Sequence, residues 1–271
     1  MEKKVKKYTI EEIQEKLAKL DKHDGKKKTS RFILSALSSI PWVGGFLSAS
    51  ASLQADIEQG KINTLQKLWL EEHQEKIELL AETLYEIISR LEKFFVAEER
   101  IESENYLALV RKGFRVWDKS DTNEKREIIR KLLTNAGATD LCPDDLIRLF
   151  IDWIELFHEA HFVVIKEIYQ NPGITRGLIW DKMNQTRPAE NSAEADLYKM
   201  LIRDLSTSGV IRQYKPVNEY GQFIKQPVKK RGNLPVHKSA FDNQEPYELT
   251  KLGSQFVQYA LNEVIPKIGE N

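Results

Sequence analysis

The side chains best suited to chemistry in this sequence are a carboxylate and two imidazoles at helical spacing. Glu155 precedes His158 by three residues, and His158 precedes His161 by three. On one helix these groups would share a face, and such a set can hold a metal ion. Metal sites in helical bundles, however, collect ligands from several helices, and the sequence has no second Glu-x-x-His motif. We therefore expect no metal, and interpret these residues as the edge of a buried helix, hydrogen-bonded to their neighbours.

Other motifs of catalysis and cofactor binding are missing from the sequence. It has no phosphate-binding G-K-[ST] motif and no G-x-S-x-G nucleophile motif. The single cysteine, Cys142, excludes a C-x-x-C site and an intramolecular disulfide, as is typical of a reducing cytosol. The first residues lack the apolar core of a secretory signal. We expect a cytoplasmic, non-enzymatic protein that uses no cofactor and no small-molecule substrate.

The composition limits the kinds of partner. The chain has 271 residues, enough for two domains. Charged residues make up 30% and hydrophobic residues 41%, which is typical of a folded, helix-rich protein. The 41 basic residues are balanced by 41 acidic ones. This balance excludes a uniformly basic nucleic-acid-binding protein, so any electrostatic argument depends on local patches.

One long stretch, residues 32–55, carries no charged side chain between Arg31 and Asp56. Pro41 breaks helices and two adjacent glycines permit a sharp reversal, so we expect an apolar hairpin of two short helices. Each arm of about ten residues spans roughly 14 Å, half of a ~30 Å hydrocarbon layer. The candidate assembly or membrane residues are Phe32, Ile33, Leu37, Ile40, Pro41, Trp42, Val43, Gly44, Gly45, Phe46 and Leu47.

An uncharged stretch of this length must be sheltered from water. It can pack in a protein core or an oligomer interface, where its serines and alanines allow close helix contact. It can also associate with a membrane, because residues 1–31 hold eleven basic and six acidic side chains and so carry about +5. Basic segments beside apolar ones are attracted to anionic lipids. The sequence leaves both environments open.

The next segment, 57–95, predicts a long helix. The apolar residues of a heptad seam, which pairs with another helix, alternate here at spacings of three and four: Ile77, Leu80, Leu84, Ile87, Leu91 and Phe94. We favour an internal bundle over a dimer, and expect residues 1–140 to form a helical bundle that presents the hairpin. Further helices are expected near 104–117 and 122–135, followed by one apolar helix over 145–169.

The carboxy-terminal part, 145–265, predicts a second domain. After Asn171-Pro172-Gly173, Thr175 can cap a short helix, and a third helix runs from Ser192 to Ser208. A β-prone segment, a long polar loop, a second strand and a helix capped by Thr250 follow. The fold class expected for the chain is thus mainly α, with a helical bundle followed by a domain that contains a short β-hairpin.

This order of elements resembles the winged helix-turn-helix superfamily over residues 157–261. The segment Leu249-Thr250, Leu252-Gly253 and Phe256 is similar to the closing motif of that superfamily, as is the stretch DLSTSGVIRQY that ends the third helix. The resemblance implies a fold, but winged helices bind DNA, RNA or protein. The amino-terminal part has no such resemblance.

Charge separates these partners. In a DNA-binding winged helix the third helix enters the major groove, usually with basic or amide side chains near its start; here that helix begins with Glu194 and Asp196. The loop after it is basic, at +6 with Glu219 as its one carboxylate, and can hold phosphates without reading sequence. Its candidate partner-binding residues are Arg212, Lys215, Lys225, Lys229, Lys230, Arg231 and Lys238.

These patterns predict a binding or effector protein. In the leading hypothesis the winged helix engages a macromolecular partner, while the apolar hairpin drives self-assembly or membrane association, as in some bacterial defence proteins. One alternative is a DNA-binding transcriptional regulator with a basic wing, dimerised through its amino-terminal helices. Another is a scaffold subunit that co-purifies with a fixed partner. A protein partner or self-association is favoured over nucleic acid.

Overall fold

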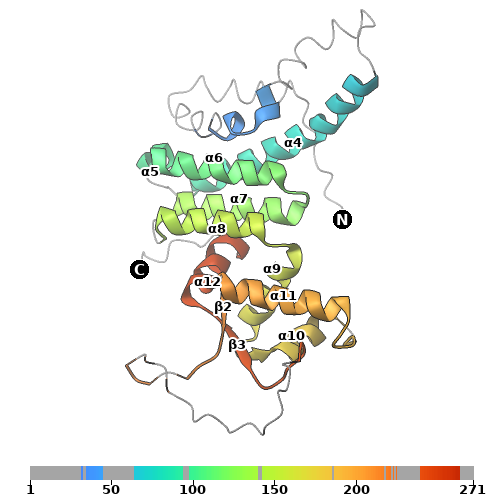
Figure 1. Ribbon diagram of the computed structural model, residues 1–271. Helices are drawn as coiled ribbons and strands as arrows, with labels where there is room; N and C mark the ends of the chain where they lie inside the picture. Colours follow the sequence, from blue (N-terminus) through green and yellow to red (C-terminus); the bar gives the residue numbers. More distant parts are fainter. Residues whose placement is uncertain are drawn as a thin grey trace, which may run out of the picture. The chain divides into compact units, whose positions relative to one another are not determined.

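A computed structural model describes residues 32, 35–44, 64–93, 98–139, 142–184, 186–216, 218–220, 222, 224 and 239–262 (Figure 1). These residues are mainly helical, with one small three-stranded antiparallel sheet. The chain divides into two compact units, residues 1–155 with 259–271 (unit 1) and residues 156–258 (unit 2). Within the described residues, no helix combines the length and apolarity needed to cross a membrane.

Unit 1 is a bundle of helices built on the heptad seam. It contains α4 (Thr64–Lys93), α5 (Glu98–Glu102), α6 (Glu104–Lys119), α7 (Asn123–Ala138) and α8 (Asp144–Leu156). The seam residues from Ile77 to Leu91 are buried, and α4 packs on α7, which in turn packs on α6. Because the seam meets helices of its own chain, its apolar side chains are covered without a second copy. Residues 57–63, 94 and 95, also expected in the long helix, lie outside the described residues.

The described part of the apolar stretch is packed into this bundle. Residues 35–38 and 41–44 are helical, and the backbone turns at residues 39 and 40. Pro41 therefore begins a helical turn, where its fixed φ and missing N–H cost nothing, whereas we expected it to lie in the break between two arms. Phe32, Ala36, Ile40 and Val43 are buried. Ile33 and the second expected arm, including Gly45, Phe46 and Leu47, lie outside the described residues.

Aromatic and polar contacts hold this stretch in place. The Phe32 ring stacks on Tyr106 of α6 at a centroid distance of 6.2 Å and meets Phe114 edge-on at 6.4 Å. The Trp42 Nε1–H donates to Asp118 Oδ1 at 2.8 Å, and the same carboxylate oxygen lies 2.6 Å from Lys76 Nζ. A buried ring and a shared carboxylate thus join the stretch to α4 and α6.

The expected helix over 145–169 is two helices. It breaks at residues 157 and 158, between α8 and α9 (Glu159–Gln170). Helix α8 belongs to unit 1, because Lys112 Nζ lies 2.6 Å from Asp152 and Lys119 Nζ lies 2.9 Å from Glu155. The boundary between units therefore lies at 155/156 rather than between 140 and 145.

The chain after unit 2 returns to unit 1. The helical turn η1 (Val257–Leu261) crosses the boundary at residue 259. The Asn135 amide donates to the Tyr259 carbonyl at 2.8 Å, and the Thr139 and Tyr259 hydroxyls are 2.7 Å apart. Residues 259–262, which we expected in the second domain, are thus bonded to α7.

Unit 2 wraps helices around a small sheet. After α9 come β1 (Ile174–Thr175), α10 (Arg176–Met183), α11 (Ala193–Thr207), β2 (Ile211–Gln213), β3 (Pro246–Leu249) and α12 (Lys251–Phe256). Strand β3 lies between β1 and β2, antiparallel to both. The predicted caps are confirmed, since Thr175 accepts from the Leu178 N–H and Thr250 from the Gly253 N–H. Gly209 ends α11 with a φ of 77°, a conformation that glycine adopts without strain.

Candidate functional site

The carboxylate and imidazoles singled out in the sequence do not share a helical face. The break at residues 157 and 158 leaves Glu155 on α8, paired with Lys119, and His161 on α9. His161 is buried, its Nδ1 accepts the His158 N–H at 3.0 Å, and its Nε2 lies 3.8 Å from Asp204 Oδ2. No group of three metal-ligating side chains occurs among the residues that the structure describes. The His161 side chain therefore caps the first turn of α9 by accepting the His158 N–H.

His161 makes unit 2 sensitive to acid. Burial lowers the pKa of His161 below its ordinary value of 6.5, against a partial opposing effect of the Asp204 carboxylate. The unfolded chain then binds the proton more tightly, so stability is complete above pH 6.5 and falls as the pH drops below that value. At about pH 5.5 the loss should reach at most ~1.4 kcal/mol. Amide hydrogen exchange of α9 and α11 at neutral and acidic pH measures it.

Two histidine variants separate this effect from general acid sensitivity. His161→Gln has no ring to protonate and keeps an oxygen that can accept the His158 N–H, so the fall of stability at acidic pH should shrink. His158→Gln removes the neighbouring exposed imidazole and should leave the fall in place. An unchanged pH profile in the His161 variant would contradict this assignment.

The start of α11 is acidic and apolar rather than basic, and an exposed arginine, Arg203, follows only near its end. Glu194 and Asp196 are exposed in its first turns, and Leu197 is 51% exposed. Its lysine, Lys199, has its Nζ 3.6 Å from Asp196 and 3.8 Å from Glu190. The cation is thus held among carboxylates of unit 2. A duplex phosphate backbone would meet carboxylates at the start of this helix, which disfavours insertion into a major groove.

The basic loop predicted from the sequence is described only in part. Arg212, on β2, is exposed, and its Nε lies 2.7 Å from Glu248 on the neighbouring strand. Lys215 is exposed beyond the end of the strand. The structure therefore assigns Arg212 a cross-strand ion pair. The remaining predicted loop residues, Lys225, Lys229, Lys230, Arg231 and Lys238, lie outside the described residues.

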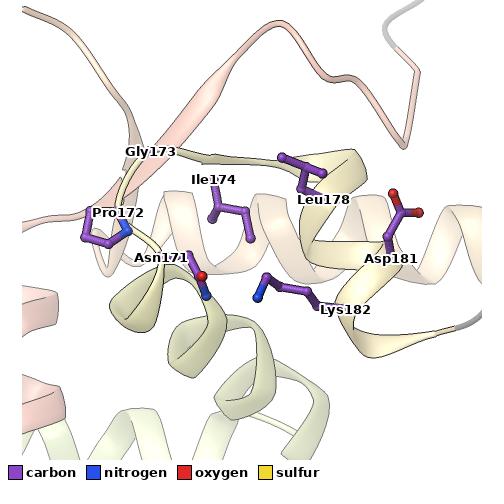
Figure 2. A pocket seen from close by; sticks show the side chains of 7 residues that line it. All are labelled: Asn171, Pro172, Gly173, Ile174, Leu178, Asp181 and Lys182. Atoms are coloured by element: carbon purple, nitrogen blue, oxygen red, sulfur yellow. The ribbon is translucent and has the colours of Figure 1, made fainter.

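A shallow groove opens between the end of α9, β1 and α10. It has a volume of about 310 Å³ and is lined by Asn171, Pro172, Gly173, Ile174, Leu178, Asp181 and Lys182. Figure 2 shows Ile174 and Lys182 reaching toward the space between the two helices, with Leu178 above it. Leu178 is 50% exposed and Ile174 is nearly buried. Its apolar floor is thus open to solvent on one side.

The charged groups at the rim of the groove are paired within unit 2. Arg187 donates to both carboxylate oxygens of Asp181, at 2.8 and 2.6 Å, and these bonds lower the pKa of that carboxyl. Lys182 Nζ lies 3.9 Å from Glu167 Oε2. Each rim charge therefore has an opposite charge beside it, and the groove carries no excess of either sign.

Local hydrogen bonds fix the walls of the groove. Gly173 turns the chain with a φ of 84°, and the Ile174 N–H donates to the Asn171 carbonyl at 3.1 Å. Outside the groove, Glu190 accepts the Ser239 hydroxyl and the Ala240 N–H, which lowers the pKa of Glu190 and joins the loop after α10 to the loop before β3. We did not predict this groove, because the sequence does not show that Leu178 faces outward.

Comparison of the chain with protein-family models, with curated proteins and with solved structures finds no match.

Proposed function

We propose that the chain is a non-enzymatic binding protein whose unit 2 is a winged helix that holds a protein partner at the groove beside α10. The winged-helix assignment is supported by the order helix, strand, two helices, two strands, helix and by the strand order β1-β3-β2. The closing segment Leu249–Phe256, at the end of β3 and in α12, supports the same assignment.

The observation that carries the proposal is the neutral, apolar character of the groove. Its floor is formed by Ile174 and the half-exposed Leu178, and its rim charges are paired. A space of about 310 Å³ can accept one or two apolar side chains, the usual anchors of protein interfaces. Phosphate groups would find no net positive charge there. These features favour a protein partner over a nucleic acid at this site.

In this proposal the apolar stretch 32–44 is part of the core of unit 1 and is not the binding site. Self-assembly or membrane association through it would require Phe32, Ala36, Ile40 and Val43 to leave the core of unit 1. Exposing four such side chains costs several kcal/mol at ~25 cal/mol per Å² of apolar surface. We propose that the described state is the resting form of the protein, and that partner binding by unit 2 does not depend on release of this stretch.

Site-specific photo-crosslinking in native cells tests the groove. With a photoreactive residue at position 182, on the rim, we expect one discrete protein adduct. The same residue at position 166, on the exposed side of α9, should give much less of it. Leu178→Lys should reduce the adduct about tenfold, because it replaces an apolar anchor by a charge that must be desolvated. Leu197→Lys, equally exposed on α11, is the matched control and should leave the adduct in place.

The crosslinking experiment also distinguishes a protein from a nucleic acid at the groove. An adduct that is insensitive to Leu178→Lys would contradict binding at the groove, and a nuclease-sensitive adduct would identify a nucleic acid instead.

The alternative function, a DNA-binding regulator, predicts retention of duplex DNA at low salt, with a steep dependence on salt. Replacing Lys229, Lys230 and Arg231 by alanine should then abolish that retention. A gel-shift at low salt without retention would exclude this regulator.

A further inference from the structure

The chain beyond β2 forms a small hydrogen-bonded reversal with an aromatic residue at its tip. The Ile224 N–H donates to the Pro216 carbonyl at 2.9 Å, and the Asn218 N–H donates to the Gln222 carbonyl at 2.8 Å. Inside these two bonds, Asn218 Oδ1 accepts the N–H groups of Tyr220 and Gln222, at 3.1 and 2.9 Å. These bonds therefore hold the backbone at the described residues of the tip.

Tyr220 projects from this tip into solvent. Its exposed fraction is 87%, larger than that of any other large hydrophobic residue in the described parts of the chain. Tyr214 and Ile224, at the two ends of the reversal, are about half exposed. A tyrosine held on a preorganised turn loses little conformational entropy when it binds. Such a residue is suited to stack on a flat partner or to fill a pocket in one.

The sequence on either side of the tip is basic, which favours a flat, anionic partner. Arg212 and Lys215 precede it, Glu219 is the one carboxylate from residue 212 to 241, and five basic residues with no acidic one occur from 225 to 238. Nucleic-acid bases offer a stacking face and their phosphates match the basic charge. In a duplex the bases are already stacked on each other and offer no free face. The exposed carboxylates at the start of α11 would also repel a duplex that approached this helix. An unpaired strand offers free base faces.

We propose that the tip segment, through its described residues 214–216, 218–220, 222 and 224, binds single-stranded nucleic acid, with the Tyr220 ring stacked on a base and the Lys215 side chain against the phosphates. This ligand goes beyond the protein partner at the groove, and the two sites use different residues. The chain would then join a protein to an unpaired RNA or DNA strand.

Fluorescence anisotropy of the full chain with labelled oligouridine and oligothymidine of about 20 nucleotides tests the proposal. We expect binding at low salt, about 50 mM, that weakens as salt increases. Tyr220→Ala should weaken it about 5- to 150-fold, the loss of one stacked base, and Tyr220→Trp should retain it. Tyr85→Ala, which removes an exposed tyrosine of α4 in unit 1, is the matched control and should have no effect.

Three outcomes of the oligonucleotide measurement would overturn the proposal. They are no binding of either single strand at low salt, equal affinity in the parent and Tyr220→Ala, and tighter binding of the corresponding duplex. Leu178→Lys should leave oligonucleotide affinity unchanged. Loss of the nucleic-acid proposal for the tip and loss of the protein-partner proposal for the groove are therefore separate results. A photo-crosslink from position 220 to a protein would assign the tip to a protein partner and contradict the nucleic-acid proposal.

Discussion

Replacing Phe32 by alanine should lower the free energy of unfolding of unit 1 by about 3–5 kcal/mol. The side chain is 1% exposed and its ring lies against Tyr106 and Phe114 of α6. Removing it leaves a cavity that the surrounding rings, themselves fully buried, cannot fill. Amide hydrogen exchange of α6 and α7, followed by mass spectrometry, measures the loss in unit 1 without assuming that the two units unfold together.

Ser38→Ala is the control for this variant. Ser38 is exposed in the same stretch and donates only to the Ser35 carbonyl, so its removal should change the stability of unit 1 by no more than about 0.5 kcal/mol. If Phe32→Ala leaves stability unchanged but lowers the mass in solution or abolishes liposome flotation, Phe32 acts outside its own unit. The self-assembly or membrane hypothesis would then replace the resting form proposed here.

Gly253→Ala should destabilise unit 2 by about 3 kcal/mol, at the upper end of the cost of overpacking. A Cβ on this glycine would lie 2.1 Å from the Val210 carbonyl oxygen and 3.0 Å from the carbonyl carbon. The Val210 carbonyl also accepts the Thr250 N–H at 3.0 Å, so it cannot turn away without loss of that bond. Alanine normally favours a helix over glycine by ~1 kcal/mol, so a net loss isolates the clash.

Lys251→Ala changes an exposed residue in the same turn of α12 and should leave the stability of unit 2 within about 0.5 kcal/mol of the parent. Exchange of the α9 and α11 amides reports on unit 2 in both variants. Equal protection in Gly253→Ala and in the parent would show that α12 can move away from β2. The close approach would then not be needed for the unit to fold.

Features that depend on neighbouring residues in the sequence could be predicted. Thr175 and Thr250 cap their helices because a hydroxyl at the N-cap position lies close to the free N–H three residues later and accepts a hydrogen bond from it. The heptad seam is also local in the sequence. It is short, so the sequence favours an internal bundle over a dimer, and α4 packs on α7 of the same chain. In unit 2 the expected helices and the two later strands are present, but the sequence did not predict β1, so the sheet has three strands rather than the two of a hairpin.

Features that depend on tertiary contacts could not be predicted. Trp153, Phe157, Ala160 and Val164 continue from α8 into α9 at spacings of four, three and four, so the periodicity gives no sign of the break at residues 157 and 158. The break is stabilised by the His161 ring, which accepts the His158 N–H in the place of a helical carbonyl contact. The groove depends on where α10 turns Leu178, and an eight-residue helix carries too weak a pattern to reveal its outer face.

The apolar stretch shows how far sequence reasoning extends. Its lack of charge correctly indicated shelter from water, but the shelter is formed by Tyr106, Phe114 and other side chains of α6 far along the chain. The sequence predicts a break at Pro41 because proline removes a donor, but at the first position of a helical turn no donor is lost. For the described part of the stretch, core packing needs no membrane and no second copy.

The return of the chain to α7 after η1 means that unit 2 is an insertion within unit 1. Its two ends leave and re-enter the same body, at residues 155/156 and 258/259. A molecule lacking everything after residue 155 would lose the Tyr259 carbonyl and hydroxyl that Asn135 and Thr139 use. Mechanical load on unit 2 would pull on α8 and on Tyr259 together, because two covalent links join unit 2 to the bundle.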